Sequence, residues 1–300
     1  MAINRAQLAK ELEPGLNALF GLEYARYENE AAQIFEQESS DRAFEEEVML
    51  VGFGQANVKA EGSAIGFDTA SESFTARYVH DTIALAFALT EEAVEDNLYD
   101  SLSARYTKAL ARSMAYTKQV RGANVLNDAF VTAGGDGVSL INVAHPTSLG
   151  GNFSNRSATD ADLNETSLEQ AMIDIAGFID ERGLKIAMKG NKLILPVNLQ
   201  FIADRILEST LRVGTADNDI NALKNMGMLP GGYTVNHYLT DTDAWFIKTD
   251  CPNGFKHFVR AALATGMEGD FDTGNMRYKA RERYSFGYSD PRAAYGSAGS

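Results

Sequence analysis

The sequence has few of the residues that mark secreted or membrane-spanning proteins. A single cysteine, Cys251, occurs in 300 residues. It therefore excludes an internal disulfide framework and a cysteine-based zinc site, and it fits folding in a reducing cytoplasm. We expect it to be a small buried or half-buried side chain. No stretch approaches the roughly 18 apolar residues of a membrane span, and the first residues lack the apolar core of a signal peptide. We expect a soluble protein without a membrane partner.

Positive charge is also scarce. The chain has 27 Lys and Arg against 41 Asp and Glu, a formal net charge of -14. Its surface as a whole should repel nucleic acid, so any DNA contact must be local. Residues 1–50 carry 4 basic and 11 acidic side chains, whereas residues 251–300 carry 7 and 5. The two ends can attract each other within one chain or between chains, and the second option suits an assembly.

Catalytic patterns are missing as well. The four histidines are far apart in the sequence: His80, His145, His237 and His257. None falls in an HExxH pair, and no nucleophile, base and orienting group occur at a recognisable spacing. The glycine-rich stretch 134–137 lacks the Lys and Ser or Thr of a phosphate-binding loop. We therefore expect no enzyme and no cofactor.

Two acidic pairs are the only candidates for a hard cation. These pairs are Asp241 with Asp243, and Asp270 with Asp272. The second does not continue into a calcium loop, because Asn275 stands where the loop needs glycine. Solvated turns are the simpler interpretation and no metal is predicted. A metal-dependent hydrolase stays open as an alternative of another class.

The amino-terminal half changes character twice. Residues 1–13 and 16–47 are predicted to be acidic helical segments separated by Pro14-Gly15. Their apolar content is too thin for a core of their own, so they form an arm. From residue 48 to 77, glycines and isolated aromatics replace helical periodicity. This stretch predicts an extended hairpin with a mobile tip.

A strand and a long helix follow. Residues 82–89 alternate large and small side chains, which predicts a strand with one buried and one closely packed face. Thr90 is a good N-cap, an apolar stripe continues to Val120, and Arg121 lies in the last turn before Gly122. About 31 residues would make a rod of ~46 Å, and something extended must lie against it.

The second half alternates short strands and helices. Residues 131–163 predict loops with short strands. A helix is expected at 167–181, a buried strand at 192–197 with a helix after it, and strands at 244–248 and 254–260. The tail at 295–300 is predicted to fray.

The last long strand carries the strongest charge pattern. From Met276 to Phe286, apolar side chains occupy one face, with Glu282 as the single charged residue among them. Basic side chains occupy the other face: Arg277, Lys279, Arg281 and Arg283. Contact with an acidic part of another subunit is the favoured interpretation, and contact of Arg277 and Arg281 with DNA is the weaker one.

This order of elements resembles the major capsid proteins of tailed bacteriophages, the Hong Kong 97-like or Johnson fold. Two segments carry the resemblance: 80–99, which is similar to the family's strand-to-spine transition, and Trp245–His257. Asp272-Thr-Gly-Asn275 and Asp290-Pro-Arg292 lie downstream. The resemblance implies an α+β fold with an N-terminal arm (1–47), an extended loop (48–78), a peripheral domain with a long spine helix (79–134 and 251–300), and an axial α/β domain (135–250).

The resemblance also implies function and partners. It predicts a virion capsid protein, assembled in the host cytoplasm, that forms hexamers and pentamers of an icosahedral shell around double-stranded DNA. Because the chain has no long region before the spine, a separate scaffolding protein is expected, with a portal protein and a decoration protein as further partners. The predicted subunit contacts are Phe53, Lys59, Phe67 and Phe74 with the basic strand face. Some relatives cross-link through a loop lysine, but the sequence identifies no partner for Lys59. An encapsulin-type nanocompartment is the nearest alternative.

Overall fold

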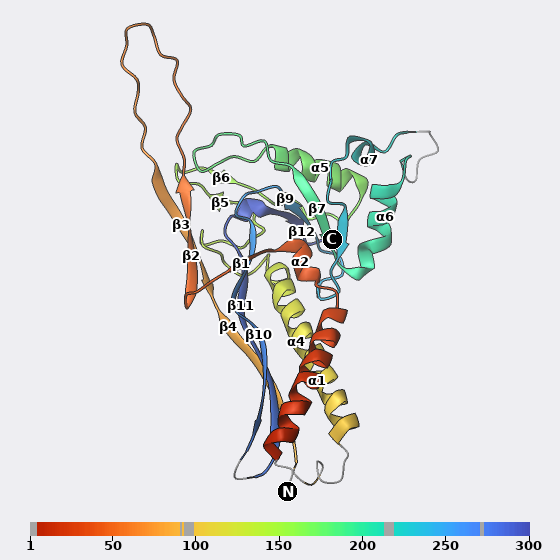
Figure 1. Ribbon diagram of the computed structural model, residues 1–300. Coiled ribbons are helices and arrows are strands. Elements are labelled where there is room, and N and C mark those ends of the chain that lie inside the picture. The colour runs from red at the N-terminus through yellow and green to blue at the C-terminus, as the bar shows by residue number, and fades with distance from the viewer. Residues whose placement is uncertain (1–4, 91, 93–98, 213–218, 271–272) are drawn as a thin grey trace.

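Two four-stranded sheets and two helix layers build the molecule, an α+β architecture with a long hairpin projecting from it (Figure 1). The computed structural model describes residues 5–90, 92, 99–212, 219–270 and 273–300. None of the helices in these segments is long and apolar enough to cross a membrane. The division into four domains stays a prediction.

The first sheet, called the peripheral sheet, is covered along one face by helices, and its other face is open except at one end, where Ala76 and Tyr78 of the hairpin pack on Phe258. Its strands in spatial order are β1 (Glu36–Ser39), β10 (Phe255–Gly269), β11 (Met276–Tyr288) and β4 (Asp81–Leu89). Helices α1 (Arg5–Arg26) and α4 (Tyr99–Asn127) lie along the same side of it (Figure 1). Their contact buries Leu16, Phe20, Leu110, Ala111, Met114, Tyr278 and Ala280. The alternation predicted for the last strand is confirmed, since Tyr278, Ala280 and Tyr284 are buried.

The amino-terminal prediction was partly wrong. Helix α1 runs through Pro14 without a break. The apolar side chains of Leu16 and Phe20 hold the following turns against α4 and β11, which offsets the cost of a proline inside a helix. Helix α2 (Glu30–Ile34) is short, and residues 36–39 pair with β10 as strand β1. Tertiary pairing therefore overrides the helical preference of this acidic segment.

The spine helix is confirmed as a long element but not in its limits. Its predicted N-cap, Thr90, is described, but residues 91 and 93–98 after it lie outside the described residues. Its predicted end at Gly122 was wrong, because α4 continues to Asn127. A Cβ atom at Gly122 would lie 3.0 Å from the Cβ of Ala31 and 3.6 Å from Phe286. The glycine therefore permits close packing of α4 against α2 and β11 and does not end the helix.

The strand at 82–89 is confirmed as β4, with one correction. Ile83 and Phe87 pack on the helix side. The opposite, alanine face was expected to be closely packed, yet Ala84, Ala86 and Ala88 are exposed. As the outer strand of the sheet, β4 also leaves Leu85 46% exposed.

The second sheet, called the axial sheet, is covered on both faces. Its strands in spatial order are β12 (Ala294–Ser297), β9 (Trp245–Thr249), β7 (Gly190–Leu195) and β8 (Tyr233–Val235). Leu193, Trp245 and Ile247 pack on one side with helices α5 (Glu165–Ala176) and α6 (Gln200–Glu208). Ile194 and Phe246 pack on the other side, against the end of α4. This double layer forms the main core.

Smaller elements complete the chain. They are strands β5 (His145–Pro146) and β6 (Asn152–Phe153), helix α7 (Ala222–Met226), and the 3-10 turns Val197–Leu199 and Pro291–Ala293. The helix predicted at 167–181 ends at Ala176. The strands predicted at 244–248 and 254–260 belong to different sheets. The prediction that the tail at 295–300 frays was wrong, because Tyr295 is 1% exposed and β12 pairs with β9.

Candidate assembly surfaces

The hairpin is the first surface that the fold leaves unused. Strands β2 (Phe44–Val51) and β3 (Ser71–Val79) pair antiparallel, and residues 52–70 extend beyond them as a long loop (Figure 1). This confirms the predicted hairpin. Large apolar side chains of the loop are exposed: Phe53 63%, Val58 100%, Ile65 70% and Phe67 99%. The described residues of the chain provide no cover for them.

Arg182 fixes the base of this loop to the axial region. Its guanidinium lies 3.1 Å from the Asp68 carboxylate and also donates to the Thr69 carbonyl. The backbone N–H of Gly54 donates to the same carboxylate at 2.8 Å. The backbone N–H groups of Gly54 and Thr69, and next the positive charge of Arg182, lower the pKa of Asp68 below its usual value. The two strands of the loop are thus joined where they leave the body.

A buried cation fixes the other end of the hairpin. Lys256 Nζ, with its side chain 6% exposed, lies 2.7 Å from carboxylate oxygens of both Glu38 and Glu47. Burial by itself would lower the pKa of Lys256, but the two carboxylates outweigh it and raise the pKa. The predicted attraction between acidic and basic ends of the chain is therefore made, at this point, within one chain.

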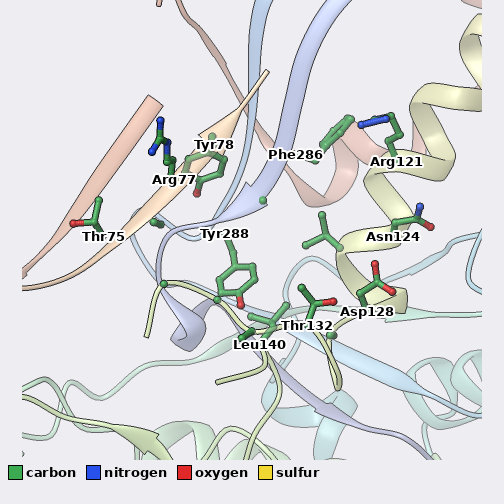
Figure 2. A pocket seen from close by; sticks show the side chains of 17 residues that line it. Thr75, Arg77, Tyr78, Arg121, Asn124, Asp128, Thr132, Leu140, Phe286 and Tyr288 are labelled. Carbon is green, nitrogen blue, oxygen red and sulfur yellow. The ribbon is translucent and has the colours of Figure 1, made fainter. Parts of the chain in front are cut away.

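A pocket of about 520 Å³ lies where the hairpin meets the body. Figure 2 shows Thr75 and Tyr78 of β3 on one side, and Asn124 of α4 with Asp128 just after this helix on the other. Tyr288 Oη points into this region and is buried without a hydrogen-bond partner among the described residues. Burial raises the pKa of this phenol.

The walls of this pocket approach each other closely at its base. A Cβ atom at Gly135 would lie 2.8 Å from the carbonyl oxygen of Thr75, so glycine lets this loop contact the backbone of β3. At the rim, Arg77 pairs with Glu46 and Arg121 pairs with Asp81. Neither Glu46 nor Asp81 lines the pocket. The pocket therefore lies where the hairpin packs against the body.

The open face of the peripheral sheet is the second unused surface. Arg277, Lys279 and Arg281 are exposed along β11, and Arg283 is half-buried. Small residues of the neighbouring strands stand beside this row: Ala84, Ala86 and Ala88 of β4, and Ala264 and Gly266 of β10. Arg277 pairs with Asp270 and Arg283 Nε donates to the His80 carbonyl at 3.3 Å. Lys279 and Arg281 have no ion pair with any described residue. The result is a basic ridge with a shallow floor on both sides.

In contrast to Lys279 and Arg281, the buried side chain of Arg292 in the axial region forms ion pairs. Arg292 Nη2 lies 2.9 Å from Glu181 and Arg292 Nη1 lies 3.2 Å from Asp290, with the Arg292 and Glu181 side chains 3% and 4% exposed. Glu181 also accepts from the backbone N–H and hydroxyl of Ser148, each at 3.1 Å. The Ser148 hydroxyl lies 3.1 Å from the hydroxyl of Ser73 of β3 and accepts from it, because its own proton is donated to Glu181. This network joins the axial region to the hairpin.

The histidines and acidic pairs have structural surroundings. His145 Nδ1 lies 2.6 Å from Asp136, both buried. His257 stacks on Phe286 with ring centroids 4.2 Å apart. Asp241 accepts backbone N–H groups of its own turn, Asp270 pairs with Arg277, and Asp272 lies outside the described residues. Within the described segments no group of three or more His, Cys, Asp or Glu could hold a metal, so the hydrolase alternative gains no support.

The predicted contact residues fall on two separate surfaces. Phe53, Lys59 and Phe67 are exposed on the loop of the hairpin. Phe74 instead lies half-buried in β3, beside Gly135 of its own chain. Sequence reasoning missed Arg182 and Glu181, which no motif marks. For Arg292 the signal existed, because Asp290-Pro-Arg292 was one of the segments that carry the family resemblance.

A half-covered sheet backed by a long helix, a fully covered second sheet and a projecting hairpin together define the Hong Kong 97-like capsid fold. Solved structures agree. The capsid of cyanophage P-SCSP1u matches with a TM-score of 0.57 at 10% identity, covering 88% of this chain and 85% of that one. Mycobacterium phage Che8 matches with a TM-score of 0.54 at 16% identity, covering 89% of each chain. A virus-like particle from Pyrococcus furiosus matches with a TM-score of 0.55 at 11% identity, covering 94% and 97%.

The sequence comparison identifies the family. The sequence model of the family described as phage capsid protein matches residues 73–297, which is most of the chain. No curated protein sequence matches. The chain belongs to the phage capsid protein family and is a structural protein of a capsid shell.

Proposed function

We propose that this chain is the major capsid protein of a tailed bacteriophage, which assembles into hexamers and pentamers of an icosahedral shell around double-stranded DNA. The exposed loop of the hairpin is the observation that carries the proposal. Phe67 and Val58 are 99% and 100% exposed, and such apolar side chains are usually covered by a partner. A neighbouring copy that covers the loop supplies the burial that the monomer lacks.

The two unused surfaces define the subunit contacts in this proposal. Phe53, Lys59 and Phe67 contact a neighbour through the loop, and Phe74 supports the base of the hairpin. The basic ridge receives an acidic segment of another copy, because carboxylates are abundant in a chain with a net charge of -14. Repetition of such head-to-tail contacts around a closed ring generates capsomers.

The family supports a set of further partners. A separate scaffolding protein, a portal protein and a decoration protein belong to this proposal, with assembly in the host cytoplasm and a final place in the virion. Packaged DNA contacts the inner surface without base specificity, since phosphate contacts carry no sequence information.

Assembly of the full chain tests the proposal directly. The chain is expressed alone and with its scaffolding protein, its mass is measured by light scattering, and the high-mass fraction is imaged by electron microscopy. Closed shells, or rings of five and six subunits, are expected. Phe53→Ser with Phe67→Ser should abolish them, whereas Val131→Ser, at a residue 84% exposed outside the hairpin, is the matched control. A monodisperse monomer or dimer under both conditions would refute the proposal.

An encapsulin-type nanocompartment shell is the second candidate. It is favoured by one observation, the match to the virus-like particle over 94% of this chain and 97% of that one. The contents of the shells distinguish the two candidates. Packaged DNA, with terminase and portal genes beside the coding sequence, supports the phage capsid, whereas an enclosed protein encoded by a neighbouring gene supports the nanocompartment.

A further inference from the structure

The outward face of the spine helix is basic, in contrast to the net negative charge of the chain. Helix α4 contains five basic residues and one acidic residue, in a chain with 14 more negative than positive charges. Lys118 pairs with the buried Glu282 at 3.3 Å, and Arg121 pairs with Asp81. These two cations serve the interior and the sheet. Arg105, Lys108 and Arg112 remain.

The three remaining cations share one face of the helix. They are exposed, whereas Leu110, Ala111 and Met114 of the same turns are 4%, 0% and 1% exposed and pack toward α1 and the sheet. Spacings of three and four residues place the cations in one row along the helix. Ala109 lies between them with an exposed side chain, so the row is not screened by a bulky neighbour.

Among the described residues, no carboxylate pairs with the first two members of this row. Arg105 and Lys108 form no ion pair with a described residue, and Arg112 Nε donates to the Tyr27 hydroxyl at 2.8 Å. Tyr27 itself is 3.5 Å from Glu23, which lies on α1 and is 4% exposed. Like charges at these spacings repel each other. An external anion beside this row would offset the repulsion.

The geometry suits the phosphate backbone of a duplex. Arg105 and Arg112 are seven residues apart, about 10 Å along the helix axis. Measured along the axis of a duplex, that distance corresponds to roughly three phosphates of one strand at about 3.4 Å each. Tyr116, 58% exposed, continues the same face and adds a hydroxyl donor.

Two basic surfaces therefore lie on opposite sides of the peripheral sheet. The basic ridge of β11 is on the open side, and α4 is on the other side (Figure 1). Alanines of β4 flank the ridge on one side, and Ala264, Gly266 and Glu268 of β10 flank it on the other, with Glu268 opposite Arg277. An extended protein segment could lie beside such small residues. The α4 row stands on a convex rod. The shape of the β11 side suits contact with a protein segment, whereas the shape of the α4 side suits contact with DNA.

We propose that Arg105, Lys108 and Arg112 on the outward face of α4 form a binding surface for the phosphate backbone of double-stranded DNA, and that this face lines the inside of the shell. The proposal rests on the proposed capsid function. It places DNA on the helix side of the peripheral sheet and the neighbouring subunit on the open side.

DNA binding by the full chain tests this assignment. A fluorescein-labelled duplex of mixed sequence, about 30 base pairs long, is titrated with protein from low salt to roughly 200 mM NaCl, and anisotropy gives the affinity at each salt concentration. The test variant is Arg105→Gln with Lys108→Gln and Arg112→Gln. The matched control is Arg277→Gln with Lys279→Gln and Arg281→Gln, which removes the same charge. Circular dichroism melting verifies that both variants fold.

The α4 variant should bind at least about tenfold more weakly than the wild type at the lowest salt. The slope of log affinity against log salt should fall in magnitude by about 2 to 3, because each phosphate that is no longer neutralised reduces it by about 0.9. The control should retain most of the slope. An equal decrease in both variants, or no duplex binding by the wild type at the lowest salt, would overturn the proposal.

A third result would also overturn it: failure of shell formation in the α4 variant without nucleic acid, with the salt slope retained, would make this face a protein contact. Light scattering and microscopy of the wild type report the capsid function separately. Shells that form while DNA binding is absent would refute only the DNA surface.

Discussion

The two four-stranded sheets differ in how many of their faces are covered. In the axial sheet, Ile247 on one face and Phe246 on the other are 0% and 2% exposed. In the peripheral sheet, Tyr278 is buried but its neighbours Arg277 and Lys279 are exposed. A sheet buried on both faces supplies its own stability, whereas a sheet with one open face has a surface available for a partner.

This difference separates the stabilising part of the chain from the associating part. The axial sheet carries two of the hydrophobic clusters, one on each face. The open face of the peripheral sheet and the loop of the hairpin carry charge and exposed aromatics instead. Substitutions in the first region should therefore change the free energy of unfolding, and substitutions in the second should change assembly.

The largest effect on stability is expected in the axial sheet. Phe246→Ala removes a ring that packs against Phe130 and the end of α4. It should lower the free energy of unfolding by about 4 kcal/mol, within the range for truncation of a buried aromatic residue. Urea unfolding followed by circular dichroism measures it. Leu85→Ala, on the half-exposed outer strand β4, is the control and should cost less than half as much.

The second largest effect on stability is expected for Arg292, a buried charge at the junction of the axial region and the hairpin. Arg292→Ala leaves Glu181, itself buried, without its cation, and removal of one partner of a buried pair is strongly destabilising, by about 3 kcal/mol. The same urea assay measures it. Arg292→Met with Glu181→Met should recover part of the stability. If the double variant is as unstable as the single one, the cost comes from packing and not from the unpaired carboxylate.

The free energy of unfolding is expected to depend on pH through His257 in the peripheral sheet. Burial, and next the positive charge of Lys118, lower the pKa of His257 from 6.5 to about 4. Between these values the unfolded chain binds a proton that the folded chain does not, so stability falls as pH decreases from 6.5 toward 4. The slope is about 1.4 kcal/mol per pH unit. Below about pH 4 the contribution is fully lost.

His257→Phe isolates this contribution, because it keeps the ring stack on Phe286 and cannot titrate. Glu282 acts in the opposite direction: burial raises its pKa, so its contribution to stability decreases as pH rises above 4.5. It is present in both proteins and cancels in their difference. Equal pH profiles for wild type and variant between about pH 5 and 7 would show that His257 is not the titrating group.

Local sequence patterns predicted what depends on local periodicity. The alternation along Met276–Phe286 predicted both faces of β11, and glycine with isolated aromatics predicted the hairpin. The predictions failed where a distant partner decides. Residues 36–39 have helical preference but pair with β10, and Tyr295 lies in a glycine-rich tail but pairs with Ile247 of β9.

The candidate surfaces divide in the same way. The residues of the basic ridge could be predicted because period 2 places them on one face. Arg182 and Glu181 could not, because their partners Asp68 and Arg292 are more than a hundred positions away. The row on α4 was readable from spacing, but its exposure depends on which side of the helix α1 and the sheet cover.

The smallest effect on stability is expected on the basic ridge, together with the largest effect on assembly. Lys279→Glu with Arg281→Glu changes two exposed side chains that form no ion pair with a described residue, so the free energy of unfolding should change by less than about 0.5 kcal/mol per site. If the ridge receives an acidic segment of another copy, the same change places like charges next to each other and light scattering should show no shells. Normal shells with reduced DNA content would instead place DNA on this face, and would exchange the roles assigned to the two sides of the peripheral sheet.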